Sequence, residues 1–178
     1  DFHKPKFLRA PMVVANNDVK YETNKFRARQ FAQMNKEAIL WCVAKDTVTL
    51  DALRDNPSLP LKKMDWLQRH DRECGDLYGM FPLIKNMPVA LTDHIDRNPE
   101  KNLLRGTVGH IHSWILHDDD VFEKYGTSVV LTKLPKAVFI KIPGATWKLN
   151  GMKEAGVYPI VPMKRGWALD RHRKVPRL

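Results

Sequence analysis

Cysteine is scarce in this chain of 178 residues, where Cys42 and Cys74 are the only two. Two cysteines exclude a disulfide framework, which favours a reducing compartment. Cys42 lies in an apolar run and is expected to be a small buried residue. Cys74 follows His70 by four residues, but a structural zinc site needs four ligands. We therefore expect no metal site here.

Long apolar segments are also lacking. No run of 18 apolar residues occurs, so no membrane-spanning helix and no membrane partner are expected. The chain begins with Asp1, and no basic stretch followed by an apolar run comes after it, which predicts no signal peptide. We interpret the chain as beginning inside a longer protein.

The sequence has no phosphate-binding loop of the form Gly-x-x-x-x-Gly-Lys-Ser/Thr, whose backbone N–H groups, lysine and hydroxyl hold a nucleotide and its metal ion. Gly151 and Gly156 have the spacing, but Val157 and Tyr158 follow them. A Gly-x-Ser-x-Gly elbow and a His-Glu-x-x-His pair are also missing. We therefore predict that residues 1–178 alone hydrolyse no ATP, hold no cofactor and contain no catalytic residue.

A few polar residues could carry acid–base or metal chemistry. Asp93 and His94 are neighbours, His110 and His112 alternate on an expected strand, and residues 118–120 are all Asp. The sequence shows no nucleophile for the first pair, and the others lack a ligand pattern such as the calcium loop. An enzyme that uses Asp93 and His94 is the least favoured alternative, and replacement of His94 would test it.

Positive charge gathers at both ends of the chain, whose net charge is +10. Residues 1–36 hold 8 Lys/Arg and 3 Asp/Glu, residues 37–120 hold 10 and 14, and residues 121–178 hold 12 and 3. Clustered positive charge is typical of proteins that bind nucleic acid, although Lys and Arg also solvate ordinary surfaces.

The first part of the chain has an α/β pattern. Val13 and Val14 predict a short strand, and residues 16–18 (Asn-Asn-Asp) predict the start of a helix over 18–34, because such side chains accept bonds from free N–H groups. We expect Asp18, at the positive end of the helix dipole, to act as a cap. A strand is expected over 38–44 and a short helix over 64–74, with Trp66 and Leu67 inward.

The second part has a β pattern with glycine and proline between short apolar runs. Strands are expected over 83–84, 89–92, 106–114, 129–131, 137–142, 145–149 and 157–161. Strands at this spacing suggest a small barrel.

Aromatic and cationic residues are interleaved near the C-terminal end. The residues are Trp114, Trp147, Tyr158 and Trp167, with Lys141, Lys148, Lys164 and Arg165. Such interleaving is typical of single-strand binding, in which bases stack and phosphates pair. The alternative is a core of large aromatics, and we expect at least two of the three Trp to be buried. Arg171 and Arg173 form a basic tail that could contact phosphate.

The order of these segments resembles the second motor domain of Pif-family helicases, which include RecD-like and Helitron-like members. Val13-Val14, Asn16-Asn17-Asp18 and Asn24-x-x-Arg27 resemble its opening strand and helix, and residues 39–46 resemble its next strand, which ends in an acidic residue. Residues 83–92 (Leu-Ile-Lys-Asn-Met-Pro-Val-Ala-Leu-Thr) and 103–109 (Leu-Leu-Arg-Gly-Thr-Val-Gly) resemble the strands that lead into its small barrel insertion.

The resemblance implies an α/β fold, a partial RecA-like motor domain followed by a small, mostly β, barrel-like insertion. The expected segments are the start of the motor domain over 1–46, a helical insert over 47–80, motor-domain strands over 81–106, and the insertion with its basic tail over 107–178. The parent protein would be an intracellular ATP-dependent DNA helicase, nuclear or organellar, acting in DNA repair and recombination. ATP and Mg would be bound with a motor domain in cis that this sequence does not include.

The resemblance and the charge pattern together give a set of candidate contacts to DNA, expected to be single-stranded. A helicase motor grips phosphates through helix starts and through amide or hydroxyl side chains. The expected contacts are Asn16, Asn17, Lys20, Asn24, Lys148, Arg165, Arg171 and Arg173. The alternative function is a non-catalytic nucleic-acid-binding module.

Overall fold

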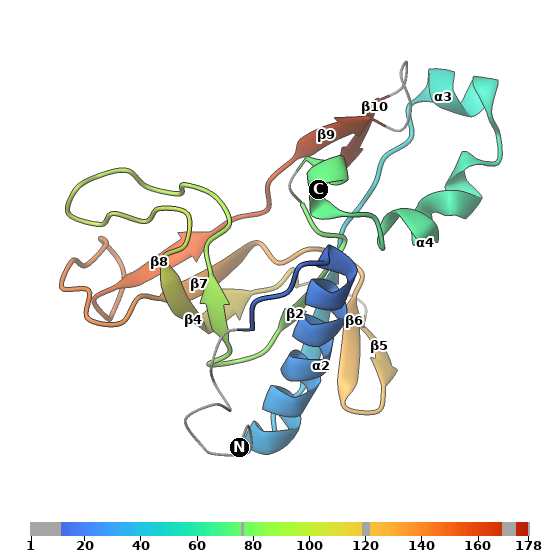
Figure 1. Ribbon diagram of the computed structural model, residues 1–178. Coiled ribbons are helices and arrows are strands. Elements are labelled where there is room, and N and C mark those ends of the chain that lie inside the picture. Colours follow the sequence, from blue (N-terminus) through green and yellow to red (C-terminus); the bar gives the residue numbers. More distant parts are fainter. Residues whose placement is uncertain (1–11, 76, 119–121, 169–173, 178) are drawn as a thin grey trace.

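The computed structural model describes residues 12–75, 77–118, 122–168 and 174–177 (Figure 1). It is a mixed helix and sheet structure whose described strands form three small sheets. The sheets have the strand orders β2-β1-β6-β5, β3-β4-β7-β8 and β10-β9. The chain visits the first two sheets alternately, so that each is built from two separate stretches of sequence.

The long helix α2 spans Asn17–Asn35, which confirms the predicted helix to within one residue at each end. Its N-cap is Asn16, whose side-chain oxygen accepts a hydrogen bond from the Asp18 N–H at 2.9 Å. The expectation that Asp18 acts as the cap is therefore wrong, and Asp18 lies in the first turn, where its charge favours the helix dipole. Lys36 caps the C-terminal end of the helix, and its φ of 55° lets its N–H bond back to the carbonyl oxygens of Ala32 and Gln33.

The first sheet lies beside α2. Strand β1 (Ile39–Val43) confirms the predicted strand and pairs antiparallel with β2 (Met80–Leu83). On its other side β1 pairs in parallel with β6 (Ser128–Leu131), and β5 (Phe122–Tyr125) forms the edge. The expectation that residues 129–131 belong to a barrel is wrong, because their backbone partners are those of β1, almost 90 residues earlier in the chain.

The second sheet is antiparallel and open. It consists of β3 (Pro88–Ala90), β4 (Val108–Ile115), β7 (Ala137–Lys141) and β8 (Val157–Ile160). No closed barrel forms among the described residues, so the expected barrel is wrong. The segment 145–149 is also not a strand, because its backbone bonds belong to turns and loops, such as the turn bond from the Ala145 N–H to the Ile142 oxygen and the loop bond from the Gly156 N–H to the Trp147 oxygen.

The start of the described chain also departs from the sequence-based expectation. Val13 and Val14 form no strand, and Val13 is 99% exposed. A two-residue apolar run is a weak strand signal without a neighbouring strand, and no strand of the described part of the chain pairs with it.

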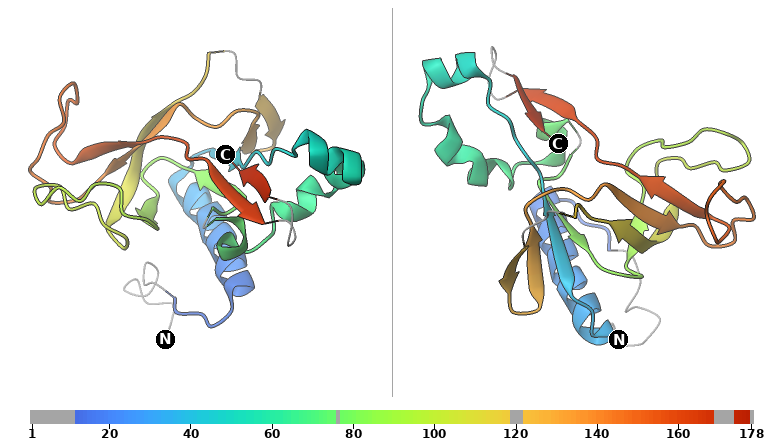
Figure 2. Two further views of the ribbon diagram at one scale, coloured as in Figure 1. Left: turned by 90° about the horizontal axis from the view of Figure 1, so that it is seen from above. Right: turned by 180° about the vertical axis from the view of Figure 1, so that it is seen from behind.

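The insert between β1 and β2 is helical, as expected. It contains α3 (Leu50–Asp55), the 3₁₀ turn η1 (Leu59–Lys62), α4 (Lys63–Trp66) and the 3₁₀ turn η2 (Asp71–Cys74). The single helix predicted over 64–74 is therefore divided in two, although Trp66 and Leu67 are buried as predicted. The hairpin of β9 (Arg165–Ala168) and β10 (Lys174–Arg177) lies beside this insert in every view (Figure 2).

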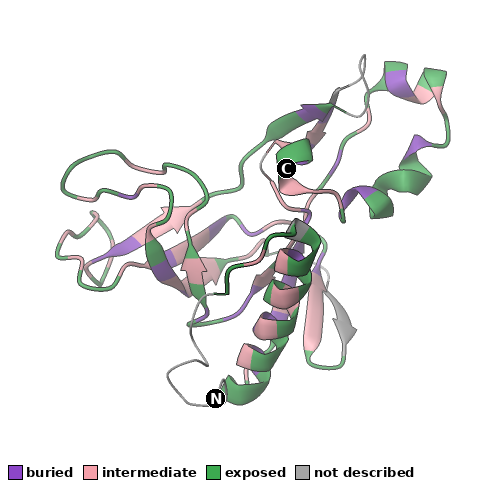
Figure 3. Ribbon diagram, in the orientation of Figure 1, coloured by how far each residue is buried: buried purple, intermediate pink, exposed green. Residues whose placement is uncertain are grey.

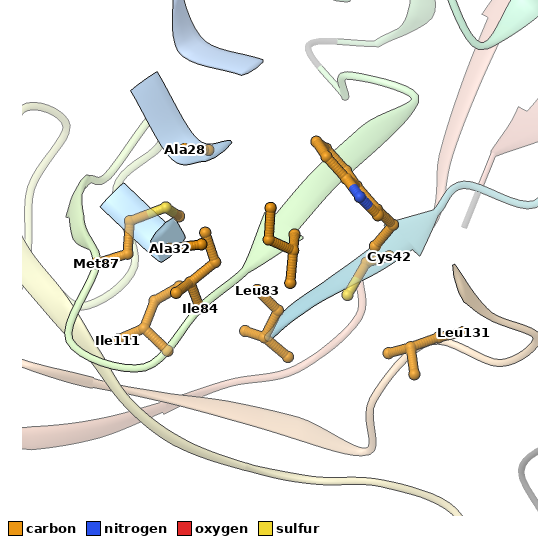
Figure 4. Packing of buried hydrophobic residues seen from close by; sticks show 10 residues of the cluster. Ala28, Ala32, Cys42, Leu83, Ile84, Met87, Ile111 and Leu131 are labelled. Carbon is orange, nitrogen blue, oxygen red and sulfur yellow. The ribbon is translucent and has the colours of Figure 1, made fainter. Parts of the chain in front are cut away.

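One apolar core joins α2 to both four-stranded sheets. Ala28 and Ala32 of α2 lie over strands β1 and β2, and Met87 and Ile111 extend the same cluster towards β4 (Figure 4). The strands behind the helix carry buried residues, whereas turns of α2 expose much of their outer surface (Figure 3). The buried members are Ala28, Ala32, Ile39, Trp41, Cys42, Leu83, Ile84, Met87, Ile111 and Leu131.

A second cluster joins the insert to the β9–β10 hairpin. Its buried members are Ala52, Leu59, Trp66, Cys74, Trp167 and Val175. Next to them lies a buried ion pair between Asp46 and Arg177, with an Nη2–Oδ2 distance of 2.7 Å. Within the insert, Gly79 lies against the Leu67 backbone, because a Cβ atom at Gly79 would lie 2.4 Å from the Leu67 carbonyl oxygen.

Candidate nucleic-acid interface

The N-terminal half of α2 brings three of the expected DNA contacts together. Asn16, Lys20 and Asn24 follow one another at four-residue spacing, so they lie on one side of the helix. Asn16 and Asn24 are exposed, and the Lys20 side chain is 36% exposed. Arg27 follows Asn24 by three residues and extends the same side. The side chain of Asn17 lies outside the described structure.

Asn16 carries two roles at the helix start. The oxygen of its side-chain amide accepts the bond from the Asp18 N–H, which leaves the NH₂ group of the same amide as a donor. The first turn of a helix has N–H groups without partners inside the helix, and they attract anions. The arrangement is therefore chemically suited to a phosphate oxygen, with donors from backbone and side chain side by side.

Lys20 is held in place by the insert. Its ammonium group lies 3.2 Å from the Asp71 carboxylate in η2 and 4.4 Å from the centre of the Tyr21 ring. Tyr21 stacks on Tyr78 with a centroid distance of 4.1 Å, and its hydroxyl oxygen accepts a bond from the Asp71 N–H at 3.1 Å. These contacts orient Lys20, but they also place a competing carboxylate beside it.

The titration of this cluster reflects both burial and pairing. Burial, and then the hydrogen bond with Asp71, raises the pKa of Tyr21, so its hydroxyl stays neutral at ordinary pH. Burial alone would raise the pKa of Asp71, but hydrogen bonds with Tyr21 and Lys20 outweigh it and lower that pKa. Asp71 is therefore ionised at neutral pH and Lys20 has an anionic partner. Asp71, Tyr21 and Tyr78 were missed in the sequence, because Asp71 is 51 residues from Lys20 and no local pattern joins them.

Arg165 and Lys148 lie elsewhere. Arg165 lies beside Gly75 at the end of η2, and its guanidinium pairs with the Asp93 carboxylate at 3.1 Å. Lys148 is exposed in the connection between β7 and β8, which projects from the end of its sheet away from α2 (Figures 1 and 2). Lys20 of α2 thus lies against the start of η2 and Arg165 of β9 lies against its end, whereas Lys148 is separate from both. Arg171 and Arg173 lie outside the described residues.

The tryptophans expected among the cations are mostly engaged within the fold. Trp167 is buried edge-on against Trp66, with centroids 5.5 Å apart, and Trp114 is partly buried against the apolar core beneath α2. Trp147 is half-buried and lies edge-on to Tyr158 at 6.3 Å. The first two therefore serve packing.

The polar residues considered for catalysis or metal binding are tied to neighbours. His94 Nδ1 accepts a bond from the Arg105 N–H at 3.3 Å, and Asp93 pairs with Arg165. The thiol of Cys74 is buried, and burial raises its pKa, which keeps it protonated. Within the described ranges, no group of three or more His, Cys, Asp or Glu side chains could hold a metal ion. Nor does any described helix have the length and apolar character to cross a membrane.

Comparison of this chain with family models, with curated proteins and with solved structures found no match.

Proposed function

We propose that this chain binds single-stranded DNA through the side of α2 that carries Asn16, Lys20 and Asn24, as a DNA-tracking part of an ATP-dependent helicase. The observation that supports it most is the regular four-residue spacing of two amides and an ammonium group, beginning at the cap of a 19-residue helix. Amide and cationic donors spaced one helical turn apart follow a phosphate backbone without reading its sequence.

The charge of the chain supports the same proposal. A net charge of +10 attracts a polyanion at long range, and the interface itself supplies the directed donors. The proposed parent is a Pif-like helicase, and the mixed sheet beside α2, with its parallel β1–β6 pair, would be the part of a RecA-like motor domain that carries this helix. A motor that moves along a strand must bind it at every position, whatever the sequence. Contacts to the phosphate backbone meet this need better than contacts to the bases.

The direct test is fluorescence-anisotropy binding of the chain to a labelled 20-nucleotide single strand, repeated over a range of salt concentrations. Each cation that neutralises a phosphate of a single strand contributes about −0.7 to the slope of log K against log salt. Lys20→Gln should weaken binding and make this slope shallower by about 0.7. Asn24→Ala should weaken binding without changing the slope, because a neutral amide displaces no counterion.

Lys36→Asn is the matched control. It removes one positive charge from the C-terminal end of the same helix, roughly 24 Å from Lys20 at 1.5 Å per residue, and asparagine suits the left-handed backbone there. Circular dichroism would establish that all variants are folded. Equal weakening by Lys36→Asn and Lys20→Gln would show that binding depends on the overall positive charge and not on this side of α2. No binding at low salt by the folded chain would reject the DNA-binding proposal.

The helicase part of the proposal needs the full-length protein. There Lys20→Gln combined with Asn24→Ala should lower the DNA-stimulated rate of ATP hydrolysis and leave the rate without DNA unchanged. If the full-length protein hydrolyses no ATP, with or without DNA, the helicase proposal is rejected and only a DNA-binding module remains.

A further inference from the structure

The open sheet contains an irregularity that changes which way two polar side chains face. Strand β4 pairs with β7 through Ile111 and Ile140, and the register then shifts so that Ser113 pairs with Phe139. On a regular strand His112 and Ser113 would lie on opposite faces. The bulge brings them together, with His112 Nδ1 and Ser113 Oγ 2.8 Å apart. Bulges of this kind re-aim side chains and are frequent beside functional sites.

A pocket of about 320 Å³ lies over this bulge, on the face that carries Phe139. Phe139, Met152 and Val157 supply its apolar surface, and His112, Ser113 and Glu154 supply polar groups. The volume lies at the lower end of the range for sites that hold small ligands. A pocket with one aromatic wall and a few polar groups is suited to a flat, polar ring.

The outer wall of the pocket is anchored to the sheet. Gly156 has a φ of 71°, and its N–H bonds to the Trp147 oxygen at 2.7 Å while its own oxygen accepts from the Ile142 N–H at 2.8 Å. A Cβ atom at this position would lie 2.8 Å from the Ile142 oxygen, so only glycine closes the connection this tightly. The wall that carries Met152 and Glu154 is thereby held before any ligand arrives.

Glu154 is oriented and partly neutralised by two cationic or polar neighbours. Lys141 Nζ lies 3.0 Å from Oε2, and His112 Nε2 lies 3.4 Å from Oε1. The bond from Lys141, and then that from His112, lowers the pKa of Glu154, so the group is a carboxylate at neutral pH. Its side chain is 56% exposed and keeps free lone pairs, because each carboxylate oxygen can accept two bonds.

We infer that this pocket holds one unstacked nucleobase of a bound single strand, and that it favours a base with an exocyclic amino group, cytosine or adenine, over thymine. The inference rests on the proposed binding of single-stranded DNA. The ring would lie against Phe139, since bases stack on aromatic side chains. Glu154 would accept a bond from the amino group, as acidic side chains do from cytosine N4. Thymine has a carbonyl oxygen at the same position, and two hydrogen-bond acceptors repel each other. A phosphate is disfavoured because it carries the same negative charge as the carboxylate.

The test compares the affinity of the whole chain for the homopolymers dC20 and dT20 at fixed salt, in the wild type and in three variants. A single base contact of this kind is worth about 1–3 kcal/mol, so the wild type should bind dC20 at least about 5-fold more tightly. Glu154→Gln should bring the ratio close to one, because its amide can serve either base. Phe139→Leu should weaken binding to both strands and preserve the ratio. Glu100→Gln makes the same change in an exposed loop and should alter neither the affinity for the two strands nor the ratio between them.

The outcomes separate this inference from the proposed function. Salt-dependent binding with equal affinity for dC20 and dT20, or a dC20 preference that Glu154→Gln leaves intact, overturns the nucleobase pocket and leaves the α2 interface standing. Equal loss of both affinities on Glu154→Gln also overturns it, since a base-selective contact must act on the ratio. No binding of either strand by the folded wild type rejects the proposed function itself.

Discussion

The sheet beneath α2 and the unit formed by residues 47–80 with the β9–β10 hairpin, here called the insert–hairpin unit, are held together by different interactions. The first has an entirely apolar cluster of buried residues, which includes Leu83 and Ile111 at 0% exposure. The second combines apolar residues with the ion pair between Arg177 of the hairpin and Asp46, the residue just before the insert, whose side chains are 0% and 1% exposed. Both regions are closely packed, but among the described residues only the second has a buried ion pair between side chains.

The bonds around Arg177 account for its burial. Its guanidinium donates to both Asp46 oxygens, at 2.8 and 2.7 Å, and to the backbone oxygens of Leu77 and Trp66, at 3.1 and 2.7 Å. Trp167 donates a further bond to Asp46 at 3.0 Å. Apolar packing tolerates small shifts because it is non-directional, whereas this network is satisfied in one arrangement only. The network therefore specifies how the hairpin closes on the insert.

The largest effect is expected from Arg177→Met. It leaves the Asp46 carboxylate buried without its cation, and breaking a buried pair from one side costs about 3–5 kcal/mol. Urea unfolding followed by tryptophan fluorescence measures this loss, since Trp66 and Trp167 both lie in the affected cluster. A loss below about 1 kcal/mol would mean that water reaches Asp46 readily and that the network contributes little.

The double variant Asp46→Leu with Arg177→Met is the control for this prediction. Removal of both charges avoids the unpaired carboxylate, so stability should recover in part. Recovery should be incomplete, because the Leu77 and Trp66 carbonyl oxygens and the Trp167 N–H lose their partners.

A slightly smaller effect is expected from Leu83→Ala in the apolar region. Leu83 is fully buried in β2, opposite Leu40 of β1, and truncation to alanine leaves a cavity. Leucine to alanine changes in cores cost about 3 kcal/mol, with a wide spread. The same urea experiment measures it, and the control Leu61→Ala, at a side chain 84% exposed, should cost under about 0.5 kcal/mol. Equal losses at the two sites would show that the sheet region is not the tight core that its burial indicates.

The two regions also differ in how far their structure could be predicted from sequence. Helix α2 and strand β1 were predicted almost to the residue, because capping side chains and apolar periodicity are local signals. The Asp46–Arg177 pair joins residues 131 positions apart, and no local pattern in the sequence links them. Val175, two residues before Arg177, is a single apolar residue between Lys174 and Pro176, which is too little to predict a buried strand.

The candidate site shows the same division between local and distant signals. Asn16, Lys20 and Asn24 were predicted from the chemistry of the helix start and from the family resemblance, and the observed helix places them on one side. Strand pairing was less predictable: β6 was assigned to a barrel because its pattern, Val-Val-Leu, fits any half-buried strand and does not specify its partner. The bulge at His112 has no local signature either, and with it the pocket over Phe139 was missed.

The smallest effect is expected where the two regions meet, at the ion pair of Lys20 and Asp71. The pair is partly exposed, with side chains 36% and 25% exposed, so screening by water limits it to roughly 1 kcal/mol or less. Because the pKa of folded Asp71 is lowered, its stabilising contribution is present above the unfolded pKa of about 3.9 and is lost as pH falls through the folded value. The difference in unfolding free energy between the wild type and Asp71→Asn should therefore be largest near about pH 7 and shrink towards about pH 3. A difference that stays constant over that range would assign the effect of Asp71 to the hydrogen bonds of its side chain with Tyr21 and with the Arg72 N–H, and not to its charge.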